Sequence, residues 1–164
     1  MKVVTFMIGA QPCVIPVHQL VEILPAREVL PIPPSEAGAA SHSGVSLLGI
    51  LNHRGKAVPV VQVHLAPADA APETAGSRTG TARRCFLIIG NVESGRVTAA
   101  LAVERVDAVM DIDDTRLQPP QDVGLQGHPA VSGMYHLNNA LTFAIDGTSL
   151  GAVLAARAVA GTRS

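Results

Sequence analysis

Short apolar runs separated by turn-forming residues dominate this chain. Val, Ile, Leu and Thr gather in runs of roughly four to eight residues, and Gly, Pro, Asn and Asp interrupt them. This pattern is typical of short strands in an all-β barrel or sandwich. The expected strands cover residues 2–8, 13–17, 45–52, 57–63, 84–90, 97–104, 106–112, 131–137 and 141–146.

Helical patterns are few. A single turn is expected within residues 18–24. A C-terminal helix is predicted over residues 148–158, because Leu150, Val153 and Leu154 fall on one face of it. Residues 146–148 can cap its first turn, since an aspartate leads them.

Residues 66–82 differ from the rest of the chain in composition. They are Ala, Pro, Gly, Ser and Thr with almost no large apolar side chain, so they cannot build a core. We therefore expect a linker or a long surface loop there.

The segments on either side of this linker resemble each other. A shift of 86 residues aligns IPVHQLVEI with LAVERVDAV and PPSEAG with PPQDVG, and a two-residue adjustment then aligns Gly49 with Gly133. Such a repeat predicts two lobes of one β topology. The domain is expected over 1–158, with lobes at about 1–65 and about 83–158 and a tail at 159–164.

Composition and charge exclude several classes of protein. The 164 residues are 48% hydrophobic and 15% charged, with a net charge of −1, so a basic face for nucleic acid or for a membrane surface is not expected. No apolar run approaches the roughly 18 residues of a membrane span. Cys13 and Cys85 lie in separate apolar runs and form no CxxC motif, which favours a reducing cytoplasm.

Motifs for catalysis and metal binding are incomplete. Gly49 and Gly55 are separated by five residues and Ala57 follows Lys56, so the phosphate-loop pattern fails. Ser46 lies in a segment one residue too long for a nucleophile elbow. The six histidines lack the spacing of a shared metal site, and DIDD at 111–114 does not continue as a calcium loop. We expect no catalytic residue, metal or cofactor.

The turn NHRG at 52–55 is a candidate functional site because it carries a histidine and an arginine. As a hairpin turn it needs positive φ at Gly55, and Asn52 tolerates a left-handed conformation. The turn itself does not need Arg54. An exposed arginine is usually only a solvated charge, but on a rigid turn Arg54 can also form a bidentate, geometrically fixed pair with Glu22. His53 is expected to be exposed.

Ordered motifs over nearly the whole chain resemble the CheW family, the receptor–kinase coupling proteins of bacterial chemosensory arrays. FMIGAQPCVIPVHQLVEIL resembles the first block, with its Ile-Pro and Val-Glu-Ile elements. LLGILNHRGKAVPVV resembles the Gly-Val-x-Asn-x-Arg-Gly block followed by Pro-Val-Val. The stretches AALAVERVDAVMDI, RLQPP and AIDGTSL match later blocks in order.

The resemblance implies an all-β fold of two SH3-like five-stranded β-barrel lobes packed together, with short helices and a C-terminal helix. It implies a cytoplasmic adaptor without enzyme activity, recruited to membrane-associated receptor arrays. The implied partners are the CheW-like regulatory domain of a chemosensory histidine kinase and the cytoplasmic tip of a chemoreceptor, with no nucleic acid and no direct membrane insertion.

The resemblance also places Glu22 and Arg54 near the receptor-binding surface, with Leu20, Ile23, Gly49 and Asn52 at neighbouring motif positions. The chain departs from the family pattern at four positions, which suggests a divergent member: Cys13, His53, Gln62 and Glu104. Two other functions stay open from the residues alone. One is a small-molecule-binding β-barrel, and the weaker one is a hydrolase using Ser46, His42 or His53.

Overall fold

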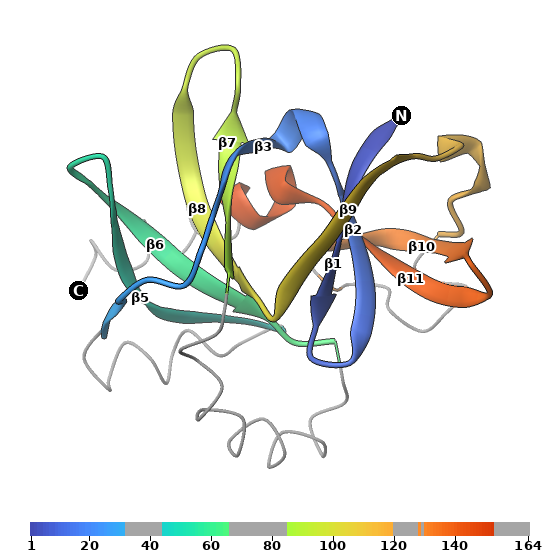
Figure 1. Cartoon of the computed structure of the whole chain (residues 1–164), viewed down its shortest axis with the longest axis horizontal. Coiled ribbons are helices and arrows are strands. Elements are labelled where there is room, and N and C mark those ends of the chain that lie inside the picture. Colours follow the sequence, from blue (N-terminus) through green and yellow to red (C-terminus); the bar gives the residue numbers. More distant parts are fainter. Residues whose placement is uncertain (32–43, 66–84, 120–127, 129, 153–164) are drawn as a thin grey trace.

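The strands of the chain form two sheets that lie side by side (Figure 1). The computed structural model describes residues 1–31, 44–65, 85–119, 128 and 130–152. The five-stranded sheet has the order β10-β11-β2-β1-β9, and the six-stranded sheet has the order β3-β7-β8-β6-β5-β4. The strands are β1 (Lys2–Ile8), β2 (Gln11–Pro16), β3 (Leu20–Leu24), β4 (Leu30–Pro31), β5 (Val45–His53), β6 (Lys56–Val63), β7 (Cys85–Asn91), β8 (Arg96–Val103), β9 (Arg105–Asp111), β10 (Val131–Leu137) and β11 (Ala140–Ile145).

The nine predicted strands are all present, with ends that differ by at most two residues. Residues 18–24 differ from the prediction of a helical turn. A short 3-10 helix, η1 (Val17–Gln19), is followed at once by strand β3, because the apolar side chains there find partners across the sheet on β7. The two-residue strand β4 carries too short an apolar pattern to be predicted.

Two short helical segments complete the described chain. A second 3-10 helix, η4 (Asp114–Arg116), follows β9. An α-helix begins at residue 147, where Asp146 caps it as predicted: Asp146 Oδ1 accepts a hydrogen bond of 3.0 Å from the backbone N–H of Thr148. The helix is described to residue 152, and the remainder of the predicted segment lies outside the described residues.

The strand pairing repeats between the two sheets. In the five-stranded sheet, β1 pairs antiparallel with β9 and β2 pairs parallel with β11. In the six-stranded sheet, β7 pairs antiparallel with β3 and β8 pairs parallel with β6. The β1–β2 hairpin, which precedes residues 66–82, therefore lies in a sheet whose other strands follow them. The β7–β8 hairpin follows residues 66–82 and lies in a sheet whose other strands precede them, so the two halves of the sequence exchange hairpins.

The repeat extends to individual residues. The 86-residue shift aligns Val14 with Ala100, and the adjusted shift that aligns Gly49 with Gly133 also aligns Val60 with Ala144. The parallel pairings agree with both alignments: Ala144 faces Val14 in one sheet, and Val60 faces Ala100 in the other. Register shifts also recur at matching places, just before each of these glycines. A Cβ at either glycine would overlap the backbone oxygen of a crossing segment, so only glycine fits.

Three apolar clusters hold the sheets. One draws on both sheets and lies between them, and each sheet also has a cluster of its own. Along β7, Leu87 and Ile89 join the shared cluster while Phe86 and Ile88 join that of the six-stranded sheet. A strand buried on both faces reads as a continuous apolar run, which explains why this segment shows no polar alternation.

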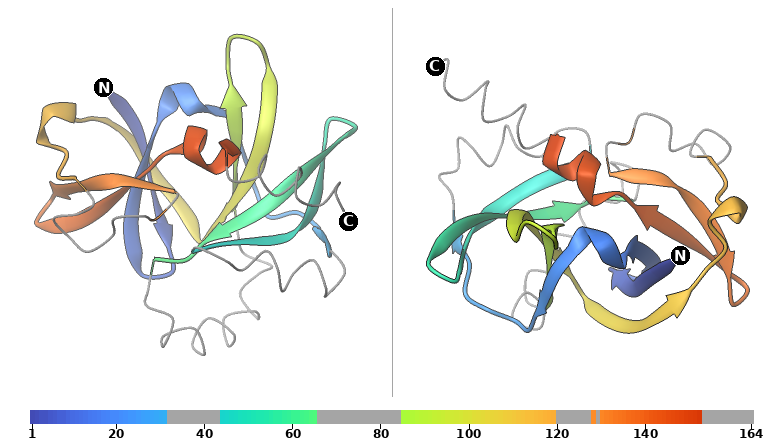
Figure 2. Two further views of the ribbon diagram at one scale, coloured as in Figure 1. Left: turned by 180° about the vertical axis from the view of Figure 1, so that it is seen from behind. Right: turned by 90° about the horizontal axis from the view of Figure 1, so that it is seen from above.

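The short helix after β11 packs at the junction of the two sheets, as Figure 2 shows. Leu150 is fully buried in the shared cluster with residues of both sheets. The first turn of the helix thus helps to fix one sheet against the other.

Replacing a leucine of the shared cluster should cost far more stability than replacing an exposed one. Leu101 is fully buried, whereas Leu141 is 51% exposed. We expect Leu101→Ala to lower the free energy of unfolding by about 2–5 kcal/mol and Leu141→Ala to change it by less than about 0.5 kcal/mol. Denaturant unfolding measures both, and equal losses would contradict the assignment of the shared core.

Candidate functional site

The hairpin turn between β5 and β6 is a two-residue turn with positive φ at Arg54 (54°) and Gly55 (82°). Positive φ at both central residues defines a type I′ turn. The left-handed residues are thus Arg54 and Gly55, and the predicted left-handed Asn52 belongs instead to strand β5. Asn52 Oδ1 accepts a hydrogen bond of 2.9 Å from the backbone N–H of Gly55, which stabilises the turn.

Glu22 on β3 meets this turn. Its Oε1 accepts a hydrogen bond from Arg54 Nη2 at 3.2 Å and a second from His53 Nε2 at 3.0 Å. The structure therefore brings Glu22 and Arg54 together as expected, although through one oxygen rather than in a bidentate fork. Because β3 and β5 are not paired in the six-stranded sheet, these side chains form a polar link between them.

His53 is buried, with 6% of its surface exposed, so the prediction of an exposed side chain is wrong. Alternation along β5 explains the burial: Gly49, Leu51 and His53 are buried and lie two residues apart on one face of the strand. The same period was visible in the sequence and would have placed His53 inward.

The electrostatics of the cluster favour an ionised Glu22. The hydrogen bond from His53, together with the positive charge and hydrogen bond of Arg54, lowers the pKa of Glu22 below the ordinary value of 4.5. The Arg54 side chain is 77% exposed and that of Glu22 32% exposed, so the pair lies at the protein surface where a partner can reach it.

The other residues implied by the resemblance play different structural parts. Leu20 is buried in the shared cluster, and Gly49 packs against the backbone of Leu30. Ile23 is 43% exposed, but it lies on the opposite face of β3 from Glu22 because neighbouring strand residues alternate. Only Asn52 joins Glu22 and Arg54 at the turn.

The residues considered for hydrolysis contact different partners in the described structure. Ser46 Oγ lies 2.5 Å from His64 Nε2, while His53 is bound to Glu22 and His42 lies outside the described residues. The carbonyl oxygen of His64 accepts a hydrogen bond from His128 Nε2 at 2.8 Å. These contacts tie the end of β6 to the segment before β10. No group of three or more His, Cys, Asp or Glu residues is placed to hold a metal within the described part of the chain.

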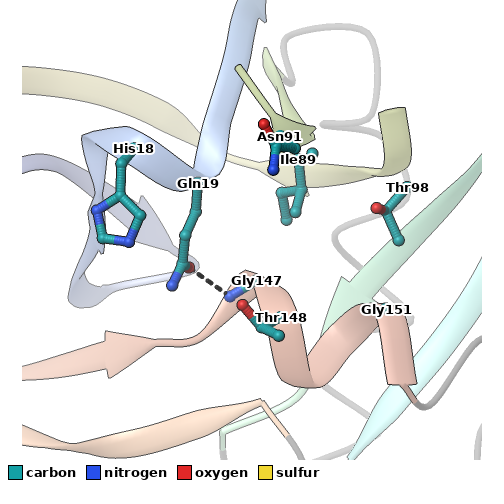
Figure 3. Close-up of a pocket in the computed structure, with 9 residues that line it drawn as sticks. His18, Gln19, Ile89, Asn91, Thr98, Gly147, Thr148 and Gly151 are labelled. Carbon is teal, nitrogen blue, oxygen red and sulfur yellow. Dashed lines mark hydrogen bonds between the residues drawn. The ribbon is translucent and has the colours of Figure 1, made fainter. Parts of the chain in front are cut away.

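A hollow of about 300 Å³ lies between η1, the β7–β8 hairpin and the helix that follows β11 (Figure 3). Gln19 faces the start of that helix, where its Oε1 accepts a 2.7 Å hydrogen bond from the N–H of Gly147. Its Nε2 donates to Asp146 Oδ1 at 3.3 Å. Sequence reasoning missed this hollow, whose volume is at the lower end for small-molecule sites. Both ends of the Gln19 side-chain amide thus tie η1 to the start of the helix that follows β11.

These features first define a class of protein: an all-β fold with an internal repeat, exchanged hairpins and an Arg54–Glu22 pair at the β5–β6 turn. A model of the CheW-like domain matches residues 2–153, and the chain belongs to this family. The predicted fold class is therefore confirmed. CheW-like domains are non-enzymatic scaffolds, which also agrees with the expectation of no catalysis.

A solved structure supports the same fold. The scaffolding protein TtCheW from Thermoanaerobacter tengcongensis superposes with a TM-score of 0.63 at 22% sequence identity, covering 88% of this chain and 82% of that chain. No curated protein sequence matches significantly. Within the described residues, no helix is long and apolar enough to cross a membrane.

The contribution of Glu22 to stability should depend on pH. Its pKa is lower in the folded protein than the ordinary value of 4.5, which applies to the unfolded chain. The ionised carboxylate therefore stabilises the fold above pH 4.5, and this stabilisation is lost as the pH falls through the folded-state pKa. Compared with Glu22→Gln, the wild-type protein should therefore lose its stability advantage as the pH falls below 4.5. Urea unfolding on both sides of this pH measures the difference, and parallel curves would contradict the prediction.

Proposed function

We propose that this protein is a cytoplasmic adaptor that couples chemoreceptors to a chemosensory histidine kinase. Its CheW-like domain spans nearly the whole chain and supports this role. The proposed partners are the CheW-like regulatory domain of the kinase and the cytoplasmic helical tip of the receptor, which would hold the adaptor at membrane-associated arrays.

The observation that carries the proposal is the arginine in the type I′ turn. Positive φ is unfavourable for most residues other than Gly and Asn, and the equivalent turn between β10 and β11 uses Asn138 and Asn139 at these positions. Arg54 thus occupies a conformation that its backbone does not prefer. Residues held in such sparsely populated conformations cluster at functional sites.

The exposed guanidinium suits a protein partner with carboxylate or carbonyl groups. A guanidinium has five N–H donors, and the Arg54–Glu22 hydrogen bond uses one of them. The other donors can reach a receptor helix that docks over the turn. Contacts to receptor and kinase can each be weak, because an array multiplies them through effective concentration.

Removing the charged pair should weaken receptor binding and leave the fold intact. We expect Arg54→Ala and Glu22→Ala each to lower affinity for a purified receptor-tip fragment about 10-fold. The melting temperature of Arg54→Ala should stay nearly unchanged, because exposed ion pairs contribute at most about 1 kcal/mol. Glu22→Ala also removes the hydrogen-bond acceptor of buried His53, so a modest drop in its melting temperature is expected. Arg116→Ala is the matched control, since its side chain is 84% exposed and lies on η4, outside the site.

Co-sedimentation with the receptor fragment and with the kinase measures these affinities. Binding of the wild-type protein to neither partner would overturn the proposed function. A large drop in the melting temperature of Arg54→Ala would show instead that Arg54 stabilises the fold.

A further inference from the structure

His53 is one of the few buried side chains with a polar ring or hydroxyl group among the described residues. Burying an imidazole costs free energy unless it forms a hydrogen bond. His53 forms that bond with Glu22, by donating Nε2–H to Oε1 at 3.0 Å. Its burial is therefore tied to one surface carboxylate.

The repeat shows that the fold does not need a histidine here. His53 pairs with Lys56 directly before its turn, and Leu137 pairs with Ala140 directly before the other turn. Leu137 packs as an ordinary apolar residue against the cluster of the five-stranded sheet. A leucine thus fills the equivalent position in the same backbone geometry.

All three members of the polar cluster are replaced together in the other half of the repeat. Leu137 stands in place of His53, and Asn138 in place of Arg54. Ala108 stands in place of Glu22, since each follows the register shift in its edge strand. Because the three residues occur as a set in one half only, His53 belongs with Glu22 and Arg54 rather than with the common fold.

We propose that His53 is a positioning residue that fixes the Glu22 carboxylate from beneath, so that Glu22 and Arg54 present a preformed surface to a partner. This inference rests on the proposed function for its biological meaning, but its geometric content stands on the described contacts alone.

The geometry explains what the positioning provides. His53 and Arg54 both donate to Oε1 of Glu22, and no described residue bonds to Oε2. Oε2 can therefore accept a donor from the partner. When Arg54 turns toward a carboxylate of the partner, His53 keeps Glu22 paired, which avoids leaving a half-buried charge without a hydrogen bond. A helical tip carrying both charge signs fits this surface.

The first test requires no partner. In His53→Leu, the residue of the equivalent position replaces the donor, and the pKa of Glu22 should rise toward its ordinary value. Carbon-detected NMR titration of the side-chain carboxyl measures it, with the resonance assigned by its loss in Glu22→Gln. His53→Gln, which retains an N–H donor, should restore part of the lowering. His136→Leu, an exposed histidine on β10, is the matched control.

The second test asks whether His53 acts through Glu22 in binding. His53→Leu should bind the purified receptor-tip fragment about 5- to 10-fold more weakly than the wild-type protein. In the Glu22→Ala background the same substitution should have no further effect, and His136→Leu should have none in either background.

The outcomes separate this inference from the proposed function. An unchanged pKa of Glu22 in folded His53→Leu overturns the positioning role, whatever the protein binds. So does a loss of binding that persists in the Glu22→Ala background, or wild-type affinity of His53→Leu. If the wild-type protein does not bind the receptor fragment but the pKa of Glu22 rises as expected, the positioning role holds and the proposed function fails.

Discussion

Exchange of hairpins between the two sheets is the constraint on which the rest of the structure depends. The β1–β2 hairpin completes one sheet and the β7–β8 hairpin completes the other, each through one antiparallel and one parallel pairing. The side chains of these central strands consequently serve two cores at once, one within their own sheet and one between the sheets. Neither sheet can be removed without breaking the shared core, so the frame behaves as one unit.

That rigid frame sets the geometry of the charged turn. Glu22 lies on an edge strand, and the turn belongs to a strand with which that edge is not paired. Their meeting therefore depends on the packing that holds β3 and β5 at a fixed separation. The backbone of the turn is fixed separately, by the Asn52 side chain. Preorganisation of this kind lowers the entropy that binding must overcome, which matters for a surface of few residues.

Sequence reasoning was strongest where the physics is local. The nine predicted strands follow from apolar runs, and the helix start follows from an aspartate cap, since both depend on neighbouring residues. The hairpin exchange could not be read in this way, because apolar periodicity does not say which distant strand is the partner. The Glu22–Arg54 contact was open to sequence reasoning only as one possible pairing of a guanidinium, and the family resemblance singled out the two residues. The two-residue spacing of His53 from Leu51 indicates burial, whereas its place beside a turn favours exposure, and the strand alternation prevails.

Duplication followed by divergence explains how one small frame can offer two different surfaces. The two type I′ turns share their backbone geometry and their position at the end of a register-shifted hairpin. One presents Arg54 beside a carboxylate, and the other presents Asn138 and Asn139, which are neutral. A charged partner of the kind proposed would distinguish between them by electrostatics, while the frame that carries both turns is the same. On the proposed function, specificity resides in three side chains rather than in the fold, so substitutions at these positions should change partner preference without disturbing the shared core.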